Sequence, residues 1–279
     1  MKLLYDVFDW MGIPILVAIF LLLYFVQRKY PLRKSVQPFF KRAVINNIIS
    51  IPSFILLRFM FLPTMGWLTI QNETWKIGLN YLFHLPHWAE AVLAILVFDY
   101  TNYLWHVLNH KLPLLWRFHL VHHTDLDLDV TTAIRFHYGE LIGSLFFRGT
   151  FVLLSGASPF VVIIYEIIFE GATLFHHSNL KLPLRLEKIL NTLIVTPRMH
   201  GIHHSDIKEE TDSNFSVIFS FWDRIHQTIR LHIRQDMIKI GVASYNRENE
   251  LTIAYLLQLP FKKIRPWKKE RLKRNQLMK

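Results

Sequence analysis

The sequence predicts an all-α integral membrane protein with about four transmembrane or re-entrant helices and a cytoplasmic helical cap. Hydrophobic residues make up 52% of the chain, which contains 22 Phe and 8 Trp and has a mean hydropathy of +0.23. This composition is too apolar for an ordinary water-soluble domain. Long uncharged runs alternate with segments rich in Lys and Arg, as in membrane proteins. In addition, 11 of the 15 histidines lie between His106 and His204, which indicates a shared site.

The charge and the cysteine count restrict the chemistry. The formal net charge is +11 and the sequence pI is about 9.8, but the basic residues flank apolar runs rather than alternating with exposed aromatic residues. We therefore expect the bilayer, and not nucleic acid, to be the partner of these charges. The chain has no cysteine, which excludes disulfides, iron–sulfur clusters and thiolate metal ligands. Any metal must be bound by nitrogen and oxygen.

Residues 1–90 are expected to form the N-terminal membrane helices and loops. The run Trp10–Val26 is uncharged over 17 residues, close to the length that spans a bilayer. A signal peptide is the alternative, but Asp6 and Asp9 precede the run and no small-residue cleavage site follows it. The linker 28–42 carries six Lys or Arg and no acid, which places it in the cytoplasm by the positive-inside rule.

The remaining apolar segments set the topology. Residues 44–62 can cross outward, residues 63–87 contain turn-prone Gly, Asn and Pro and suit an external loop, and residues 88–105 can return. Two further apolar stretches between Leu141 and Leu174 are separated by a turn signal at residues 155–159, which predicts a helical hairpin. Its arms are short enough to be re-entrant. This topology brings every histidine-rich segment to the cytoplasmic face.

Residues 91–230 are expected to form the catalytic domain, and residues 231–279 a basic cytoplasmic tail. The last part of the tail, residues 261–279, carries nine Lys or Arg against one Glu. Such a segment either is a solvated end or binds anionic lipid headgroups.

Three histidine boxes carry the chemistry. His106 and His110 in HVLNH are four residues apart, so both imidazoles project from one helix face. The spacing H-x-x-H-H then occurs twice, as His119, His122 and His123 in HLVHH and as His200, His203 and His204 in HGIHH. Core packing alone does not explain this recurrence, because each buried imidazole would need its own hydrogen-bond partner. The boxes indicate a metal site.

Eight imidazoles exceed the coordination of one ion, so we expect a histidine-rich dimetal site with a ninth ligand from His176 or His177. Neutral imidazole suits iron, zinc, copper and nickel, so the ligand type alone does not select the metal. A site that faces the membrane and receives apolar substrates suits oxygen chemistry on C–H bonds better than zinc hydrolysis of polar bonds. Iron is therefore the expected metal.

Other polar side chains could orient the ligands or add one. A metal-bound imidazole usually donates its second N–H to a carboxylate, amide or carbonyl. Asp99 lies two helical turns before His106, and further candidates follow the boxes: Asp125, Asp127, Asp129, His137, Glu140, Asp212 and Asn214. Each could instead be a helix-end charge, a solvated loop carboxylate or a helix cap.

These motifs resemble those of the fatty acid hydroxylase and sterol desaturase superfamily of membrane diiron enzymes. The resemblance runs from about Asp99 to about Thr228 and rests on motifs that occur in the family's order. They are DYTNYLWHVLNH, LPLLWRFHLVHHTD, TTAIRFHYGE, FHHSN, TPRMHGIHHS, ETDSNFS and FWDRIHQT.

The resemblance implies that the eight box histidines bind two iron ions, with His177 of FHHSN as the additional ligand. It also implies an O2-dependent oxidoreductase that hydroxylates or desaturates a lipid or sterol. The chain departs from the family pattern at Val107, where Arg is usual, at Tyr138, where Pro is usual, and at His226-Gln227, where Phe-Gly is usual. These departures leave the ligand set intact and affect positions that would contact the substrate or the electron donor.

The chain contains no G-x-G-x-x-G loop and no cysteine cluster, so the electrons are expected from a separate reductase, cytochrome or ferredoxin. Two other functions are consistent with a histidine-rich membrane protein. A metal transporter or metal-binding membrane protein should carry its ligands within several membrane helices. A zinc-dependent lipid hydrolase should carry a general base, as in H-E-x-x-H. The oxidised lipid and carbon stay open, as does the choice between a bacterial inner membrane and the endoplasmic reticulum.

Overall fold

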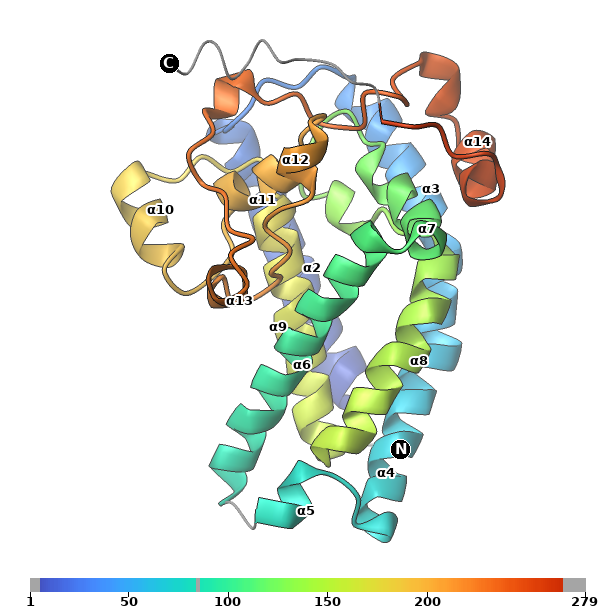
Figure 1. The fold of residues 1–279 in the computed structure, drawn as a ribbon, viewed down its shortest axis with the longest axis vertical. Helices are drawn as coiled ribbons and strands as arrows, with labels where there is room; N and C mark the ends of the chain where they lie inside the picture. The colour runs from blue at the N-terminus through green and yellow to red at the C-terminus, as the bar shows by residue number, and fades with distance from the viewer. Residues whose placement is uncertain (1–5, 84–85, 268–279) are drawn as a thin grey trace.

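The computed structural model describes residues 6–83 and 86–267, and their regular structure is helical (Figure 1). No strand occurs among these residues, in which only isolated bridges such as Ile194–Phe219 and Ser205–Ile240 form. The predicted all-α class is confirmed.

Six long helices build the elongated body, and shorter helices gather mainly at one end (Figure 1). The long helices are α2 (Ile13–Lys29), α3 (Phe39–Leu56), α4 (Leu62–Trp75), α6 (His87–Lys111), α8 (Tyr138–Ser155) and α9 (Pro159–His177). The short helices are α5 (Leu79–Phe83), α7 (Pro113–His123), α10 (Leu184–Leu190), α11 (Pro197–His203), α12 (Lys208–Thr211), α13 (Phe221–Ile225) and α14 (Ile253–Gln258). Single π turns, Phe8–Gly12 and Leu57–Phe61, precede α2 and α4.

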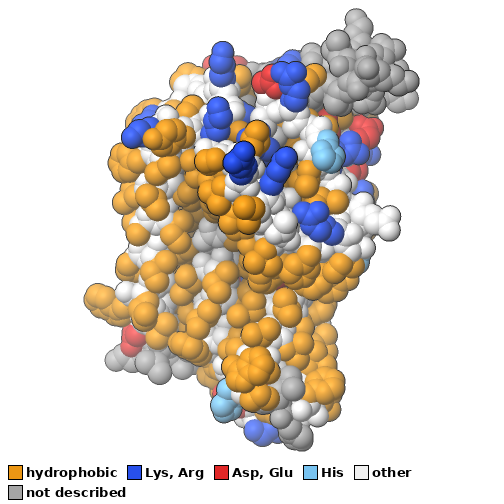
Figure 2. All heavy atoms as spheres, turned by 90° about the vertical axis from the view of Figure 1, so that its left-hand side faces the viewer, with side chains coloured by type: hydrophobic (Ala, Val, Ile, Leu, Met, Phe, Trp, Pro, Cys, Tyr) orange, Lys and Arg blue, Asp and Glu red, His pale blue; other side chains and the backbone are white. Residues whose placement is uncertain are grey.

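Four helical segments are long and apolar enough to cross a membrane: Phe8–Lys29, Phe39–Phe83, His87–Lys111 and Pro159–His177. Figure 2 shows hydrophobic side chains covering the lower part of the molecule, whereas Lys and Arg gather on the upper part. An apolar band with basic residues at one end is the surface expected of a membrane protein. The prediction of about four membrane helices is confirmed.

The prediction that residues 63–87 form a loop is wrong, because most of the described part of this segment is helical. The π turn Leu57–Phe61 leads directly into α4, and the helix continues through Pro63. Asn72 is buried and donates hydrogen bonds to the carbonyls of Val152 and Leu153 on α8. These turn-prone residues are therefore accommodated within a helix that packs against α8, and α4 ends only at Lys76, which has a φ of +53°.

The predicted hairpin is present as α8 and α9, which run the length of the body (Figure 1). Ser155 ends α8, Gly156 adopts a left-handed φ of +69°, and the Ser158 side chain caps α9. The arms have 18 and 19 residues, longer than the dozen apolar residues of each sequence run, because polar residues extend both helices. The arm formed by α9 is long enough to span rather than re-enter.

A helical cap covers the end of the body at which α2 and α6 terminate and α9 delivers His177 (Figure 1). Residues after 230 contribute to it, since Val242, Tyr245, Leu256 and Leu259 form a buried cluster with Leu120 of α7. The C-terminal segment is thus packed against the cap as far as residue 267. The most basic part of the predicted tail, 268–279, lies outside the described residues.

Candidate metal centre

The structure brings all nine predicted histidine ligands together at the junction of body and cap. The last turns of α6 supply His106 and His110, the C-terminal half of α7 supplies His119, His122 and His123, and the end of α9 supplies His177. The remaining three, His200, His203 and His204, come from α11 and its C-cap.

The nine imidazoles divide into two groups, each with ligand atoms within 4.8 Å of one another. The first group contains His106, His110, His119, His123 and His203, and the second contains His122, His177, His200 and His204. The groups adjoin, since the ring centroids of His123 and His204 are 4.4 Å apart. The boxes therefore interleave: α7 and α11 each contribute to both groups, which favours two neighbouring ions over one.

The ring nitrogens converge as metal ligands would. In the second group, His177 Nε2 lies 3.0 Å from the Nε2 atoms of both His122 and His200, and His204 Nε2 lies 3.1 Å from His200 Nε2. In the first group, the buried Nε2 atoms of His110 and His203 have no hydrogen-bond partner among the described residues. Buried nitrogens are costly without a partner, so the arrangement fits metal ions bound by imidazole.

Backbone carbonyls fix the orientation of four ligands through the other ring nitrogen. The Nδ1 atoms of His106, His122, His177 and His203 lie 2.8, 3.2, 2.8 and 2.8 Å from the carbonyls of Phe215, Arg135, Thr173 and Ser213. A hydrogen bond donated by Nδ1 leaves Nε2 as the metal ligand. The sequence does not reveal these partners, because a carbonyl contact leaves no side-chain signature.

Two of the predicted carboxylates lie against ligands. Glu140 Oε1 is 3.0 Å from His119 Nδ1 and accepts a hydrogen bond from Asn109. Asp212 Oδ1 lies 3.7 Å from His110 Nδ1, too far for a hydrogen bond but close enough for charge interaction, and its other oxygen is 3.2 Å from Lys111 Nζ. The Glu140 carboxyl therefore holds the His119 ring directly.

Three of the predicted orienting residues form hydrogen bonds with nearby backbone groups and not with a box histidine: Asp99, Asn214 and His137. Asp99 accepts hydrogen bonds from the backbone of Ile218 and Phe219 and from the Trp222 indole. Its two-turn spacing from His106 therefore positions a loop of the cap instead of the imidazole.

Asn214 has a φ of +56° and donates to the carbonyls of Met199 and Arg230, so it fixes the chain beside α11. His137 caps α8 by accepting from Gly139 N, and its Nε2 lies 3.1 Å from the Leu257 carbonyl.

His176 lies beside the centre but belongs to neither group. Its Nδ1 is 3.1 Å from the Val217 carbonyl, and its ring centroid is 4.1 Å from that of His200. Of the two candidates for the ninth ligand, the geometry therefore favours His177, whose Nε2 atom meets the second group.

Asp125, Asp127 and Asp129 follow the second box but bind Arg42 rather than imidazole. Arg42 pairs with Asp125 at 2.8 Å and with Asp129, and all of these side chains are buried. Burial raises the pKa of Asp125, but the guanidiniums of Arg42 and Arg135 outweigh this effect and leave it below its usual value. The sequence interpretation of Arg42 as a membrane-flanking charge missed this role.

Burial keeps five box imidazoles of the cap neutral at physiological pH. Burial, reinforced by neighbouring imidazoles, holds the pKa of His122, His123, His200 and His204 well below the usual value. Burial also lowers the pKa of His203 to about 3. Neutral imidazole is the form that binds metals, so these ligands need not lose a proton first.

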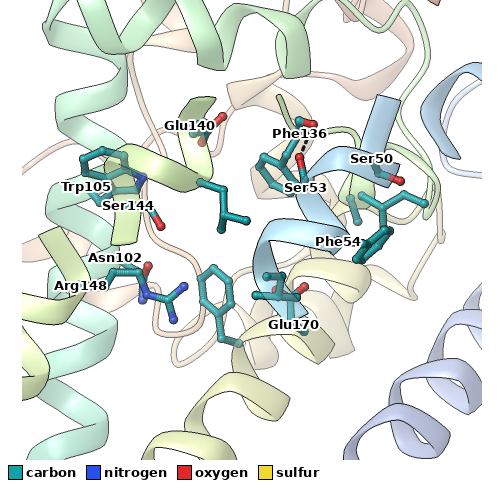
Figure 3. A pocket seen from close by; sticks show the side chains of 15 residues that line it. Ser50, Ser53, Phe54, Asn102, Trp105, Phe136, Glu140, Ser144, Arg148 and Glu170 are labelled. Carbon is teal, nitrogen blue, oxygen red and sulfur yellow. Dashed lines mark hydrogen bonds between the residues drawn. The ribbon is translucent and has the colours of Figure 1, made fainter. Parts of the chain in front are cut away.

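Two adjoining cavities lead from the membrane part of the body to the histidines. A cavity of about 70 Å³ is bounded by box histidines, among them His106 and His122. A second, mostly apolar cavity of about 130 Å³ extends into the helix bundle between α3, α6, α8 and α9 (Figure 3). The residues that line both cavities are Asn102, Trp105, Phe136, Glu140 and Phe169.

Comparison with known proteins gives the same relationship as the motifs. The fatty acid hydroxylase family model matches residues 91–228. A cholesterol 25-hydroxylase-like protein of Danio rerio is 28% identical over 171 residues, which cover 58% of this chain and 65% of that protein. The ornithine lipid hydroxylase OlsE of Rhizobium tropici is 28% identical, with coverage of 56% and 46%. The alkylglycerol monooxygenase of Homo sapiens is 27% identical, with coverage of 60% and 37%.

No solved structure matches this chain significantly. The matches cover less than two thirds of the length of these relatives. The segment matched by the family model, residues 91–228, supplies every box histidine. Residues 91–228 of the chain thus form a fatty acid hydroxylase domain.

Proposed function

We propose that this protein is a membrane-bound diiron oxygenase that oxidises a C–H bond of a lipid or sterol with O2 and electrons from an external donor. The observation that carries the proposal is the position of two adjoining histidine groups at the end of a mostly apolar cavity within a membrane helix bundle. Two bound iron ions would supply the O2 activation that side chains alone cannot provide.

The residues of the chain would hold and orient this centre. Nine imidazoles offer nitrogen ligands, and the carbonyl contacts keep four of the rings turned with Nε2 inward. Glu140 steadies His119 and also lines both cavities, so it connects the metal site with the space for substrate. Such preorganisation keeps the reacting atoms in a fixed geometry.

The cavity would select an apolar substrate and exclude bulk water. Phe54, Leu57, Leu141 and Phe169 contribute to its apolar wall, and the cavity lies among helices that can span the membrane. A lipid could therefore reach the centre from the bilayer. Hydroxylation is the favoured outcome, since the relatives above are named hydroxylases and a monooxygenase, and desaturation is the related alternative.

The cap would face the cytoplasm, where a reductase, cytochrome or ferredoxin can dock. Segment 28–42, from the end of α2 to the start of α3, carries six Lys or Arg and no acid, and Lys and Arg gather on the upper part of the surface in Figure 2. The positive-inside rule assigns this end to the cytoplasm, and a basic surface attracts an acidic donor. The membrane would be a bacterial inner membrane or the endoplasmic reticulum.

Iron content and oxygen consumption test the proposal. We expect the purified protein to bind about two iron ions and to consume oxygen only with both a lipid substrate and a reductase–ferredoxin pair. His203→Ala removes a ligand of the first group and His122→Ala one of the second, so each should lower iron content and abolish turnover. His232→Ala, outside both groups, serves as control. Full iron and full turnover in both ligand variants would contradict the assignment, and metal uptake into liposomes without oxygen consumption would favour a transporter.

A further inference from the structure

A polar cluster lines the substrate cavity and extends from beside the metal centre toward the membrane end. Arg148, Glu170, Ser144 and Asn102 line the cavity, whose wall is otherwise mostly apolar. In Figure 3, Glu140 lies at one end of the cavity, whereas Arg148 and Glu170 lie toward the other. Ionisable side chains inside a membrane helix bundle are costly and usually serve a function. The metal centre does not use these groups.

The helices align these groups with the site. Glu140, Ser144 and Arg148 are spaced by four residues along α8, so they lie on one face over two turns. Glu166, Glu170, Thr173 and His177 have the same kind of spacing along α9. Seven residues of α9 separate Glu170 from the predicted ligand His177, a rise of roughly 10 Å along the helix axis. Glu170 and the metal site are therefore about that far apart along α9.

One ion pair fixes the polar end. Arg148 forms a salt bridge with Glu166, and its guanidinium lies 4.8 and 5.0 Å from the ring centroids of Phe61 and Phe169. Arg148 and Glu166 also line a second, smaller pocket next to the cavity. Arg148 is thereby committed to Glu166 and to the aromatic rings.

The groups left over are hydrogen-bond acceptors. Glu170 lines the cavity and forms no hydrogen bond or ion pair with the residues that the structure describes. Asn102 uses its Nδ2 to donate to Phe98 O and the Tyr165 hydroxyl, which leaves its carbonyl oxygen available. Ser144 adds a hydroxyl on the same wall. The base described at this end, Arg148, is paired with Glu166, so an anionic ligand group would find no free cation among the described side chains there.

We infer that Glu170 anchors a hydrogen-bond-donating group of the substrate, a hydroxyl or an amine, with Ser144 and Asn102 as further acceptors nearer the metal centre, and that the carbon to be oxidised lies roughly 10 Å from Glu170. This inference rests on the proposed function, because it takes the cavity as the substrate chamber. It narrows the substrate class to lipids with a neutral or cationic donor group remote from the oxidised carbon. It excludes lipids that would place a carboxylate or phosphate at this end.

Binding of a matched lipid panel tests the anchor without turnover. The full-length protein, as isolated and without electron donor, is incubated with hexadecanol, hexadecylamine, hexadecanoic acid and hexadecane, and bound ligand is measured by native mass spectrometry. We expect the alcohol and the amine to bind about tenfold or more tightly than the acid and the alkane. Only the first two donate a hydrogen bond to the Glu170 carboxyl group, and such a bond strengthens binding by about this factor.

Substitutions at Glu170 separate the contributions of charge and hydrogen bonding. Glu170→Leu should remove the preference for both donors, whereas Glu170→Gln should weaken amine binding more than alcohol binding. Glu90→Gln is the matched control, because Glu90 lies in the first turn of α6 and pairs with His87 outside the cavity.

Two results would overturn the anchor: equal binding of acid and alcohol by the unmodified protein, or an undiminished preference in Glu170→Leu. The first comparison needs no variant, so it stands even if a substitution prevents folding. A protein that shows the preference but oxidises no lipid would contradict the proposed function and support the anchor.

Discussion

At the scale of single residues, the centre depends on what holds each imidazole. Glu140 is buried and lies 3.0 Å from His119 Nδ1, whereas four other ligands use backbone carbonyls. A backbone carbonyl stays in place when its residue is substituted, so these four acceptors cannot be removed by mutation. The Glu140 acceptor is a side-chain carboxyl, so a substitution at this position can remove it.

We expect Glu140→Ala to lower iron affinity by about 10–100-fold, because it leaves His119 Nδ1 without its acceptor. Glu140→Gln retains an acceptor and should lose less. Iron retained against a chelator measures the effect, with exposed Glu209→Ala of α12 as control. Equal iron retention in Glu140→Ala and the unmodified protein would show that the Glu140 contact does not support the ligand.

Neighbouring basic residues at the start of α3 should differ sharply in their contribution to stability. Arg42 pairs with buried Asp125 and Asp129, whereas Lys41 pairs with Glu248 at exposed positions. We expect Arg42→Met to destabilise the protein by about 3–5 kcal/mol, because it leaves buried carboxylates unpaired. Lys41→Met should cost about 0–1 kcal/mol. Thermal unfolding in detergent measures both, and similar midpoints for the two variants would contradict the buried role of Arg42.

At the scale of elements, the end of the body opposite the cap depends on close backbone contact. Gly78, between α4 and α5, has a φ of +117°, and a Cβ there would lie 2.4 Å from the Gly156 backbone nitrogen. This contact joins the α4–α5 connection to the turn of the α8–α9 hairpin. It explains why a segment with loop-like composition is held against the helices.

Gly78→Ala should therefore lower stability by more than about 1 kcal/mol, since both its backbone conformation and the close contact disfavour a side chain. Gly171→Ala is the control, because it lies inside α9 with only an ordinary contact to Ile19 at 3.4 Å and should be neutral or slightly stabilising. Thermal unfolding midpoints of the two variants in detergent measure this difference in stability. A Gly78→Ala variant as stable as the control would refute the close-packed turn.

At the scale of the whole molecule, the α4–α5 end and the cap lie at opposite ends of the body (Figure 1). The chain has no cysteine, so single-cysteine variants can be labelled without background. A membrane-impermeant maleimide should label Thr74→Cys from outside intact cells and Lys208→Cys only after permeabilisation, because the positive-inside rule predicts that the basic end faces the cytoplasm. Labelling of both positions from the same side would contradict the proposed topology.

The sequence by itself determined the helical membrane class, the hairpin turn and the residues of the histidine groups. These features follow from local patterns: apolar runs, a turn signal at 155–159 and imidazoles at helical spacing. Only the tertiary structure decided how α7 and α11 share their histidines between two groups, that Asp99 and Asn214 hold loops, and that Arg42 is buried. These outcomes depend on contacts between residues far apart in the chain, such as Arg42 and Asp125, which neither periodicity nor composition encodes. The helical continuation through Pro63 and Asn72 likewise depends on packing against α8, which overrides the local preference for a turn.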